Sequence, residues 1–579
     1  MNPKKTLVAI GVILFTVLVM IVLIIFPEDS QLESTIEPPV FSPQTLALLE
    51  GAADDELLLA FSSTEPFIRG QGLKDIEIMA SNPNAVIYYT LDGSTPTTES
   101  NVFYRRLQIG STRATAYGRA IVLRAIAVYG DKVSQPITQT YFLAPRVDNR
   151  FDTLIFSIST NPDYLFCHYN GIFVPGIIRE EFIRDNPGHN VIPPDPANFN
   201  LRGREAERPA YIEVFSPDGE RVFSQGAGIR THGGWSRAQE QKSIRIIARQ
   251  EYSPGYGQFH FDFFPWEVAH DGSPITRYDT LVLRNGGNDR YHGVFRHELG
   301  SILARNAGFT AVSPVRPAAV FVNGEYYGFA WLQVRFNAQY IQNLFNTPTR
   351  NIDVVGMGEW WHDTEDTRII NDLEHKNSFA YKDLLDDDTF AEFESLVDID
   401  NMLFYYAFQI FMGNEDWPHN NLRRWRYTGP QLGLTQETDG RWRYILFDLD
   451  WTLGLYGDDY TKPTFYRVLV RDDLRSPLLA NVLSRPDMQE RFTGIMQHIS
   501  DNVVNEQTVT ETLDYLWSIS RNEFTHALSA GKYPYWFTTG FAEYNHRNMV
   551  NFARYRYRQI FADMDAFFKS YEGEAYADY

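Results

Sequence analysis

Two short stretches in the second half of the chain carry residues that could do chemistry together. In "GNEDWPHNNLRRW", Asp416 stands five positions before Asn421, and "FDLDWTLG" follows with Asp448 and Asp450. A carboxylate can orient an attacking hydroxyl and accept its proton, while an amide oxygen can hold a divalent cation without adding a repelling charge. In an extended segment the two aspartates of the second stretch share a side, as hard oxygen ligands suited to Mg²⁺ or Mn²⁺. These residue types favour phosphoryl transfer.

The residues between the two stretches predict a hairpin that brings them to one cleft. "RRWRYTG" and "GRWRYILFD" alternate like strands, and the turn-rich "PQLGLTQETD" joins them. Protein kinases use the same D-x-x-x-x-N offset in their catalytic loop, ahead of a metal-binding aspartate. The spacing alone also fits a structural role, in which Asp416 caps a helix and Asn420–Asn421 form a turn before a strand.

The elements around these motifs predict a two-lobed α+β domain from about residue 150 to about 570. Strand-like runs dominate its first part, including "KSIRIIAR" and a hairpin with its turn at Asn323-Gly324. "VFRHELGSILARNAG" has helical spacing and ends at Gly308. Beyond about residue 395 the apolar pattern is largely helical. A β-rich half followed by a helix-rich half is typical of an α+β domain.

The residues from 66 to 145 predict a separate, small all-β sandwich. Their short alternating runs are separated by Asp-Gly and Asn-Pro turns. "YYTLDGSTPT" resembles the signature of the β-sandwich at the C-terminus of chitobiases and hexosaminidases. The resemblance implies an accessory module that either binds polysaccharide or serves as a spacer. Residues 28–65 are acidic and rich in proline, which predicts a stalk with a short helix.

The N-terminal residues 1–27 predict a membrane anchor. Leu7–Phe26 is a run of 20 residues without a charge, about what a hydrocarbon core of ~30 Å requires. Lysines precede the run and acidic residues follow it, so the N-terminus is expected in the cytoplasm and the bulk of the chain outside. Cleavage as a signal peptide, giving a secreted protein, is the alternative.

Net charge and cysteine content narrow the class of protein further. A net charge of −21 over 579 residues argues against a nucleic-acid partner, which would need a basic face. The single cysteine, Cys167, allows no internal disulfide and no cysteine-rich zinc site. Both features are typical of a bacterial cell-surface protein rather than a small secreted disulfide scaffold.

From about 150 to 570 the chain resembles the CotH kinase family, the spore-coat-type atypical protein kinases. The resemblance rests on five segments in order: "GIRTHGGWSRAQEQKSIRI", "LVLRNGGNDRYHGVFRHEL", "VNGEYYGFAWLQVRF", "NEDWPHNNLRRW" and "FDLDWTLG". It implies an enzyme that transfers the γ-phosphoryl group of ATP, with Mg²⁺ or Mn²⁺, to Ser/Thr residues of cell-surface proteins.

The resemblance also implies roles for individual residues. Asp416 matches the catalytic aspartate, and Asp448 matches the metal-binding aspartate. Lys242 matches a lysine that pairs with nucleotide phosphates, and Glu298 on a helix is a candidate partner for it. The remaining candidates are Asn421 and Asp450 as metal ligands, and Arg230, Arg237 and Arg284 in the nucleotide cleft.

Two departures from the family pattern leave other functions open. Val334 stands where the family commonly has a glutamate, and Asn337 where it has an aspartate. An inactive surface scaffold or adhesion protein on a kinase-like fold is therefore one alternative. "DLDWTLG" also resembles the nucleophile loop of haloacid-dehalogenase-type phosphatases, with Asp448 as nucleophile and Asp450 as acid/base, which gives a second alternative.

Overall fold

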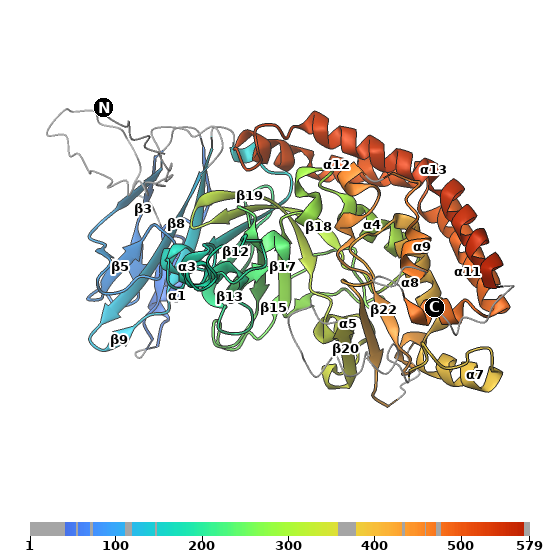
Figure 1. Ribbon diagram of the computed structural model, residues 1–579. Coiled ribbons are helices and arrows are strands. Elements are labelled where there is room, and N and C mark those ends of the chain that lie inside the picture. The colour runs from blue at the N-terminus through green and yellow to red at the C-terminus, as the bar shows by residue number, and fades with distance from the viewer. Residues whose placement is uncertain are drawn as a thin grey trace, which may run out of the picture. The chain divides into compact units, whose positions relative to one another are not determined.

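The computed structural model describes most of the chain beyond residue 40 (Figure 1). The described residues are 41–53, 56–69, 73–110, 119–144, 147–356, 378–430, 435–457, 459–469 and 476–571. Within these ranges no helix combines the length and apolar character needed to cross a membrane. The predicted anchor at Leu7–Phe26 lies outside the described residues, as does part of the predicted stalk. The mixed α+β class is confirmed.

Helix α1, Pro43–Glu50, is the short helix expected within the stalk. Ser42 caps it by accepting a hydrogen bond from the backbone N–H of Thr45, and a proline occupies its first position. The stretch predicted as stalk also contains a strand, β1, Leu59–Phe61, which pairs with β4 of the next module. The β-module therefore begins before residue 66.

The N-terminal module is a β-sandwich-like set of three sheets. A six-stranded sheet has the order β2-β10-β8-β5-β6, with β9 paired to β8, and two-stranded sheets join β1 to β4 and β3 to β7. Its buried core includes Ile76, Leu123 and Tyr141. The strands after β1 are β2 Phe67–Arg69, β3 Leu73–Ile76, β4 Ile78–Ala80, β5 Val86–Thr90, β6 Asn101–Val102, β7 Leu107–Gly110, β8 Arg119–Tyr129, β9 Lys132–Val133 and β10 Ile137–Ala144.

A closed seven-stranded barrel with the order β11-β12-β13-β14-β17-β19-β18 follows. Its strands are β11 Leu154–Ser159, β12 Arg208–Phe215, β13 Arg221–His232, β14 Ser243–Ile247, β17 Thr280–Arg284, β18 Val315–Val322 and β19 Glu325–Val334. The predicted Asn323-Gly324 hairpin is confirmed between β18 and β19, and both turn residues have positive φ, as a type I′ turn requires. Shorter elements of this part are α2 Pro162–Phe166, α3 Gly176–Asp185, β15 Phe259–His260, β16 Arg277–Tyr278, α4 Arg296–Asn306 and α5 Ala338–Phe345.

Beside its own core, the module contributes Phe67, Ala120 and Phe142 to the main hydrophobic core that includes the barrel. Phe142 of β10 packs edge-on against Phe215 and Phe321 of the barrel, at centroid distances of 5.2 and 5.1 Å. Thr140, also on β10, donates a hydrogen bond of 2.6 Å to the buried carboxylate of Glu213 on β12. The module is thus packed onto the barrel and is no detached spacer.

The C-terminal part is mostly helical around a small antiparallel sheet, β20-β21-β22. The strands are β20 Ile352–Gly356, β21 Arg423–Tyr427 and β22 Arg443–Ile445, and β21 and β22 form the hairpin predicted between the two acidic stretches. The helices are α7 Asp387–Leu396, α8 Ile399–Met412, α9 Thr464–Leu469, α10 Pro477–Val482, α11 Pro486–His498, α12 Glu506–Ser529 and α13 Thr539–Tyr571. Helix α8 is buried on nearly every face, which makes it a rigid support for the loop that follows.

Candidate functional site

The loop after α8 holds Asp416 in a half-enclosed position. Gly413 ends the helix in the left-handed conformation, at φ 65°. The Asp416 carboxylate accepts hydrogen bonds from the side-chain amides of Asn420, at 2.8 Å, and Asn421, at 2.9 Å. Arg467 of α9 fixes the loop by donating to the backbone carbonyl of Trp417 at 2.6 Å. Asn420 was not singled out from the sequence as an Asp416 partner, although it lies one position from Asn421.

The surroundings of Asp416 raise its pKa toward neutral pH. Burial raises its pKa to about 6, and the Asp448 carboxylate acts in the same direction, while the Asn420 amide opposes the shift. The backbone N–H of Glu415 donates to the carbonyl of Trp451 at 3.1 Å, so the two acidic stretches lie side by side although the β21–β22 hairpin separates them in the sequence. The expected convergence of both acidic stretches is therefore observed.

The second acidic stretch turns sharply as it leaves β22. Asp448 has φ 54° and Asn421 has φ 57°, so both lie in the left-handed region that non-glycine residues seldom adopt. The backbone N–H of Leu449 donates to Nδ1 of His297 at 3.1 Å, which ties the turn to helix α4. Such strained residues cluster at sites where the surrounding structure dictates the conformation.

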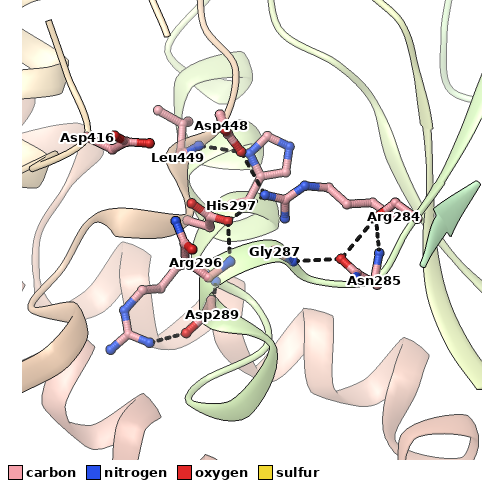
Figure 2. A network of polar contacts seen from close by, with 12 residues as sticks. Arg284, Asn285, Gly287, Asp289, Arg296, His297, Asp416, Asp448 and Leu449 are labelled. Atoms are coloured by element: carbon pink, nitrogen blue, oxygen red, sulfur yellow. Dashed lines mark hydrogen bonds and ion pairs between the residues drawn. The ribbon is translucent and has the colours of Figure 1, made fainter. Parts of the chain in front are cut away.

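Arg284, at the end of β17, extends toward Asp448 (Figure 2) and joins it to Asp450. Its Nη2 donates to Asp448 Oδ1 at 2.8 Å and to Asp450 Oδ2 at 2.6 Å. Burial alone would lower the pKa of Arg284, but Asp450 and Asp448 outweigh it and raise that pKa. Burial and Asp448 raise the pKa of Asp450. Arg284 is therefore a fixed positive charge within the acidic cluster.

A glycine turn after β17 completes the surroundings of Asp450. Gly287 has φ 57°, and a Cβ at this position would collide with both the Asp450 carboxylate and the Arg284 guanidinium. The backbone N–H of Asn288 donates to Asp450 Oδ2 at 2.7 Å. Asp289 pairs with Arg296 at the start of α4, as Figure 2 shows. The glycine allows the chain to approach the carboxylate closely.

The lysine–glutamate pair expected between Lys242 and Glu298 is not formed, which corrects that prediction. Glu298 is fully buried and accepts a hydrogen bond from Gln333 at 3.2 Å, and burial raises its pKa to about 8. Lys242 donates from Nζ to the carbonyl of Gln239 at 2.6 Å and lies 4.6 Å from the Phe199 ring centroid. Burial lowers the pKa of Lys242 to about 8.

An arginine cluster, defined by Arg230, Arg245, His232 and their basic neighbours, lines the β13–β14 surface. Arg245 Nη2 lies 2.6 Å from His232 Nδ1, and Arg245 Nε is buried without a hydrogen-bond partner. Burial lowers the pKa of Arg245, and Arg335 and Arg230 lower it further. Within the described ranges no ion pair includes Arg230 or Arg245. The other basic neighbours that act on Arg245 are Arg237 and Arg423.

Arg230 and Arg237 were predicted from the sequence, but Arg245 and Arg335 were missed. Arg230 donates to the carbonyl of Gly203, and Arg237 to that of Leu201, so both are held near a common surface. The missing signal was strand register, which places Arg245 opposite Arg230. Sequence alternation alone does not reveal which strands are neighbours.

The two departures from the family pattern have structural explanations. Val334 is 5% exposed and belongs to the hydrophobic core, with Leu281 as its cross-strand partner. Asn337 caps α5 by accepting a hydrogen bond from the N–H of Tyr340 at 3.0 Å. Asparagine serves at a helix N-cap as well as aspartate does. Asn337 therefore keeps a local role that either residue could fill.

The phosphatase alternative does not fit this topology. Its nucleophile loop normally ends the first strand of a parallel α/β sheet. Asp448 instead follows β22, the edge strand of an antiparallel three-stranded sheet.

Two protein-family models match the chain. The model of the CotH kinase protein family matches residues 229–560, which is more than half of the chain. The chain therefore belongs to the CotH kinase protein family. The chitobiase/beta-hexosaminidase C-terminal domain model matches residues 71–139, within the β-module. No curated protein matches the chain.

The donor set at the cleft suits a hard divalent cation. Asp448 keeps 38% of its side chain exposed, and Asn421 commits its Nδ2 to Asp416, which leaves Oδ1 as the atom for a cation. Asp450 Oδ1 is buried with no hydrogen-bond partner. Carboxylate and amide oxygens are the ligands that Mg²⁺ takes in proteins. Within the described ranges, no group of three or more His, Cys, Asp or Glu residues is placed to hold a metal ion, so an ion here would depend on the Asn421 amide as well.

Proposed function

We propose that this protein is an atypical protein kinase, anchored by its N-terminal residues with the bulk of the chain extracytoplasmic. It transfers the γ-phosphoryl group of ATP to Ser/Thr residues of cell-surface proteins. The convergence of Asp416, Asn421 and Asp448 supports the proposal, because phosphoryl transfer needs an acceptor-orienting carboxylate beside hard metal ligands. The β-module, by its family, would place the enzyme near polysaccharide.

In this proposal, Asp416 orients the acceptor hydroxyl and takes its proton. The two asparagine amides hold the carboxylate in one orientation, and the raised pKa lets it accept a proton near neutral pH. Asn421, Asp448 and Asp450 are the residues from which Mg²⁺ or Mn²⁺ would take ligands. When bound, the ion would neutralise charge on the phosphates.

The nucleotide phosphates would lie against the arginine cluster. Arg230 and Arg245 are adjacent cations without ion-pair partners in the described ranges, and guanidinium groups bind phosphate through paired N–H donors. Lys242 contributes a further positive charge if its hydrogen bond to Gln239 is exchanged for one to phosphate. The arginine cluster thus supplies the positive charge for the phosphates that Lys242, paired with Glu298, was expected to supply.

The alternative of an inactive scaffold or adhesion protein is permitted by the anchor, the stalk and the β-module, and its argument against catalysis is the departure at Val334 and Asn337. Both residues have packing or capping roles in this structure. Neither departure removes a group from the cluster of Asp416, Asn421 and Asp448.

Transfer of labelled phosphate tests the proposal. The full-length chain is incubated with γ-labelled ATP and Mn²⁺ or Mg²⁺, with casein as a general acceptor, beside the Asp448→Ala variant. We expect labelling of the chain itself or of casein that disappears in the variant and on chelation of the metal. Equal labelling by the wild type and by Asp448→Ala would refute the assignment of the site.

A further inference from the structure

Arg284 occupies the space between the two carboxylates that a second divalent cation would need. One nitrogen, Nη2, donates to both Asp448 and Asp450, at 2.8 and 2.6 Å. A single donor atom shared by two carboxylates is arranged as a bridging cation would be. Figure 2 shows this guanidinium reaching the turn from the β17 side.

The site around Asp450 is built for the guanidinium. The side chains of Asp450 and Arg284 are only 3% and 10% exposed, whereas Asp448 keeps 38% of its side chain exposed. Asp450 Oδ2 receives the Asn288 N–H in addition to Arg284, and Gly287 leaves room for no side chain at this contact. Asp450 thus faces the protein interior, and Asp448 is accessible to solvent.

Charge balance and solvent exposure give Asp448 and Asp450 different roles. The guanidinium balances one of the two negative charges that Asp448 and Asp450 carry when ionised. One carboxylate charge then remains for a cation, on the residue that solvent can reach. Asn421 donates from Nδ2 to Asp416, which leaves its Oδ1 as an uncharged oxygen for the cation.

We propose that Arg284 is a built-in cation that replaces a second metal ion, so that the site takes one divalent ion, held by Asp448 and Asn421. The inference rests on the proposed function, which supplies the reason for a divalent ion. It narrows the three proposed metal ligands to Asp448 and Asn421, and replaces the ligand role of Asp450 by a positioning role, as the counter-ion that holds Arg284.

Counting bound Mn²⁺ tests the inference. Free Mn²⁺ is measured by electron paramagnetic resonance during titration of the full-length chain, with and without a non-hydrolysable ATP analogue. We expect one ion per wild-type chain. Two ions per chain would overturn the inference and leave the kinase proposal standing, whereas no ion under either condition would overturn both.

Variants assign the ligands. The double variant Arg284→Met/Asp450→Asn keeps the single charge of Asp448 and should still bind one ion, whereas Asp448→Asn should bind none. Arg284→Met alone should bind a second ion, because both carboxylates then lack their counter-charge. Loss of Mn²⁺ binding in the double variant, or a count of one in a folded Arg284→Met, would contradict the inference.

A matched control separates charge from stability. Removing one partner of a buried ion pair destabilises a protein, so Arg284→Met can fail to fold. Arg305→Met removes an arginine from another buried carboxylate, Glu267, and should bind one ion as the wild type does. If Arg284→Met does not fold, the double variant Arg284→Met/Asp450→Asn, which removes both partners of the buried pair, decides the question, since a single retained ion there shows that Asp450 is not a required ligand.

Discussion

Arg230 on β13 and Arg245 on β14 are directly opposite each other in an antiparallel strand pair. Like charges in this position destabilise a sheet. No ion pair in the described part of the chain relieves them, and Arg245 has a buried Nε without a partner. An anion that binds between them would remove the repulsion, which is the physical reason to place phosphates there.

Replacing Arg245 by methionine should weaken nucleotide binding without weakening the fold. Hydrogen bonds to charged groups contribute about 1.5–3 kcal/mol, so the affinity for ATP should fall about 10- to 100-fold. The melting temperature without nucleotide should stay unchanged or rise, because a repelling charge is removed. Calorimetric titration with ATP and thermal unfolding measure the two effects.

Arg316→Met is the control for this variant, because Arg316 is a partly buried arginine of β18 that donates to the carbonyl of Phe263. It should leave the ATP affinity unchanged. Equal affinities in wild type and Arg245→Met would show that the arginine cluster does not hold the phosphates.

Asp416→Asn should separate catalysis from binding. The carboxylate acts on the acceptor hydroxyl in the transition state, so its loss should lower kcat by roughly three orders of magnitude or more, with little change in the KM for ATP. The asparagine keeps the size of the side chain. Steady-state kinetics at several ATP concentrations measure both constants, and a large rise in KM with an unchanged kcat would assign Asp416 to binding instead.

The pH dependence should report the same carboxylate. Its pKa is raised from 3.8 to about 6, so phosphoryl transfer should decline as the pH falls below about 6, where Asp416 gains a proton. The folded chain binds this proton more tightly than the unfolded chain. The stability contributed by the protonated group is therefore present below about pH 4 and lost as the pH rises through about 6.

Asp416→Asn cannot ionise, so it keeps that stability at neutral pH. One pKa unit corresponds to about 1.4 kcal/mol, so the variant should unfold with up to about 3 kcal/mol more free energy than the wild type at pH 7, and with no advantage at pH 4. Denaturant unfolding at both pH values makes the comparison. An advantage that is the same at both would mean that the carboxylate is not the cause.

Val334→Glu should destabilise the protein rather than restore activity. Val334 belongs to the apolar core, and burying an unpaired carboxylate there should cost about 3 kcal/mol at pH 7. Val334→Gln is the uncharged control of the same length. The difference in the free energy of unfolding between the two variants should decrease as the pH falls and the glutamate is protonated. Higher activity in Val334→Glu would show that this position belongs to the site.

The sequence revealed the parts of the site that depend on short-range spacing. The Asp416–Asn421 offset, the hairpin before Asp448 and the turn at Asn323-Gly324 are all local patterns, and the structure contains each of them. Arg284 was a candidate for the cleft, but its contact with Asp450 joins residues far apart in the chain. Such contacts are not encoded in any local period.

The residues that sequence reasoning missed or misplaced depend on register and burial. Arg245 becomes notable only because β13 and β14 are neighbours. Glu298 was expected beside Lys242, but the position of α4 directs it toward Gln333. Val334 was interpreted as the loss of a functional glutamate, because the sequence alone does not show that this position is buried.

The packing of Phe142 on Phe215 and Phe321 has a consequence for where the chain can be cut. The family boundaries suggest two separable pieces, but truncation before residue 150 would strip a cover of aromatic side chains from the barrel and leave the Glu213 carboxylate without its Thr140 donor. The shortened chain would expose an apolar surface of the barrel and is expected to aggregate. The two regions that the family models match are therefore expected to fold as one unit.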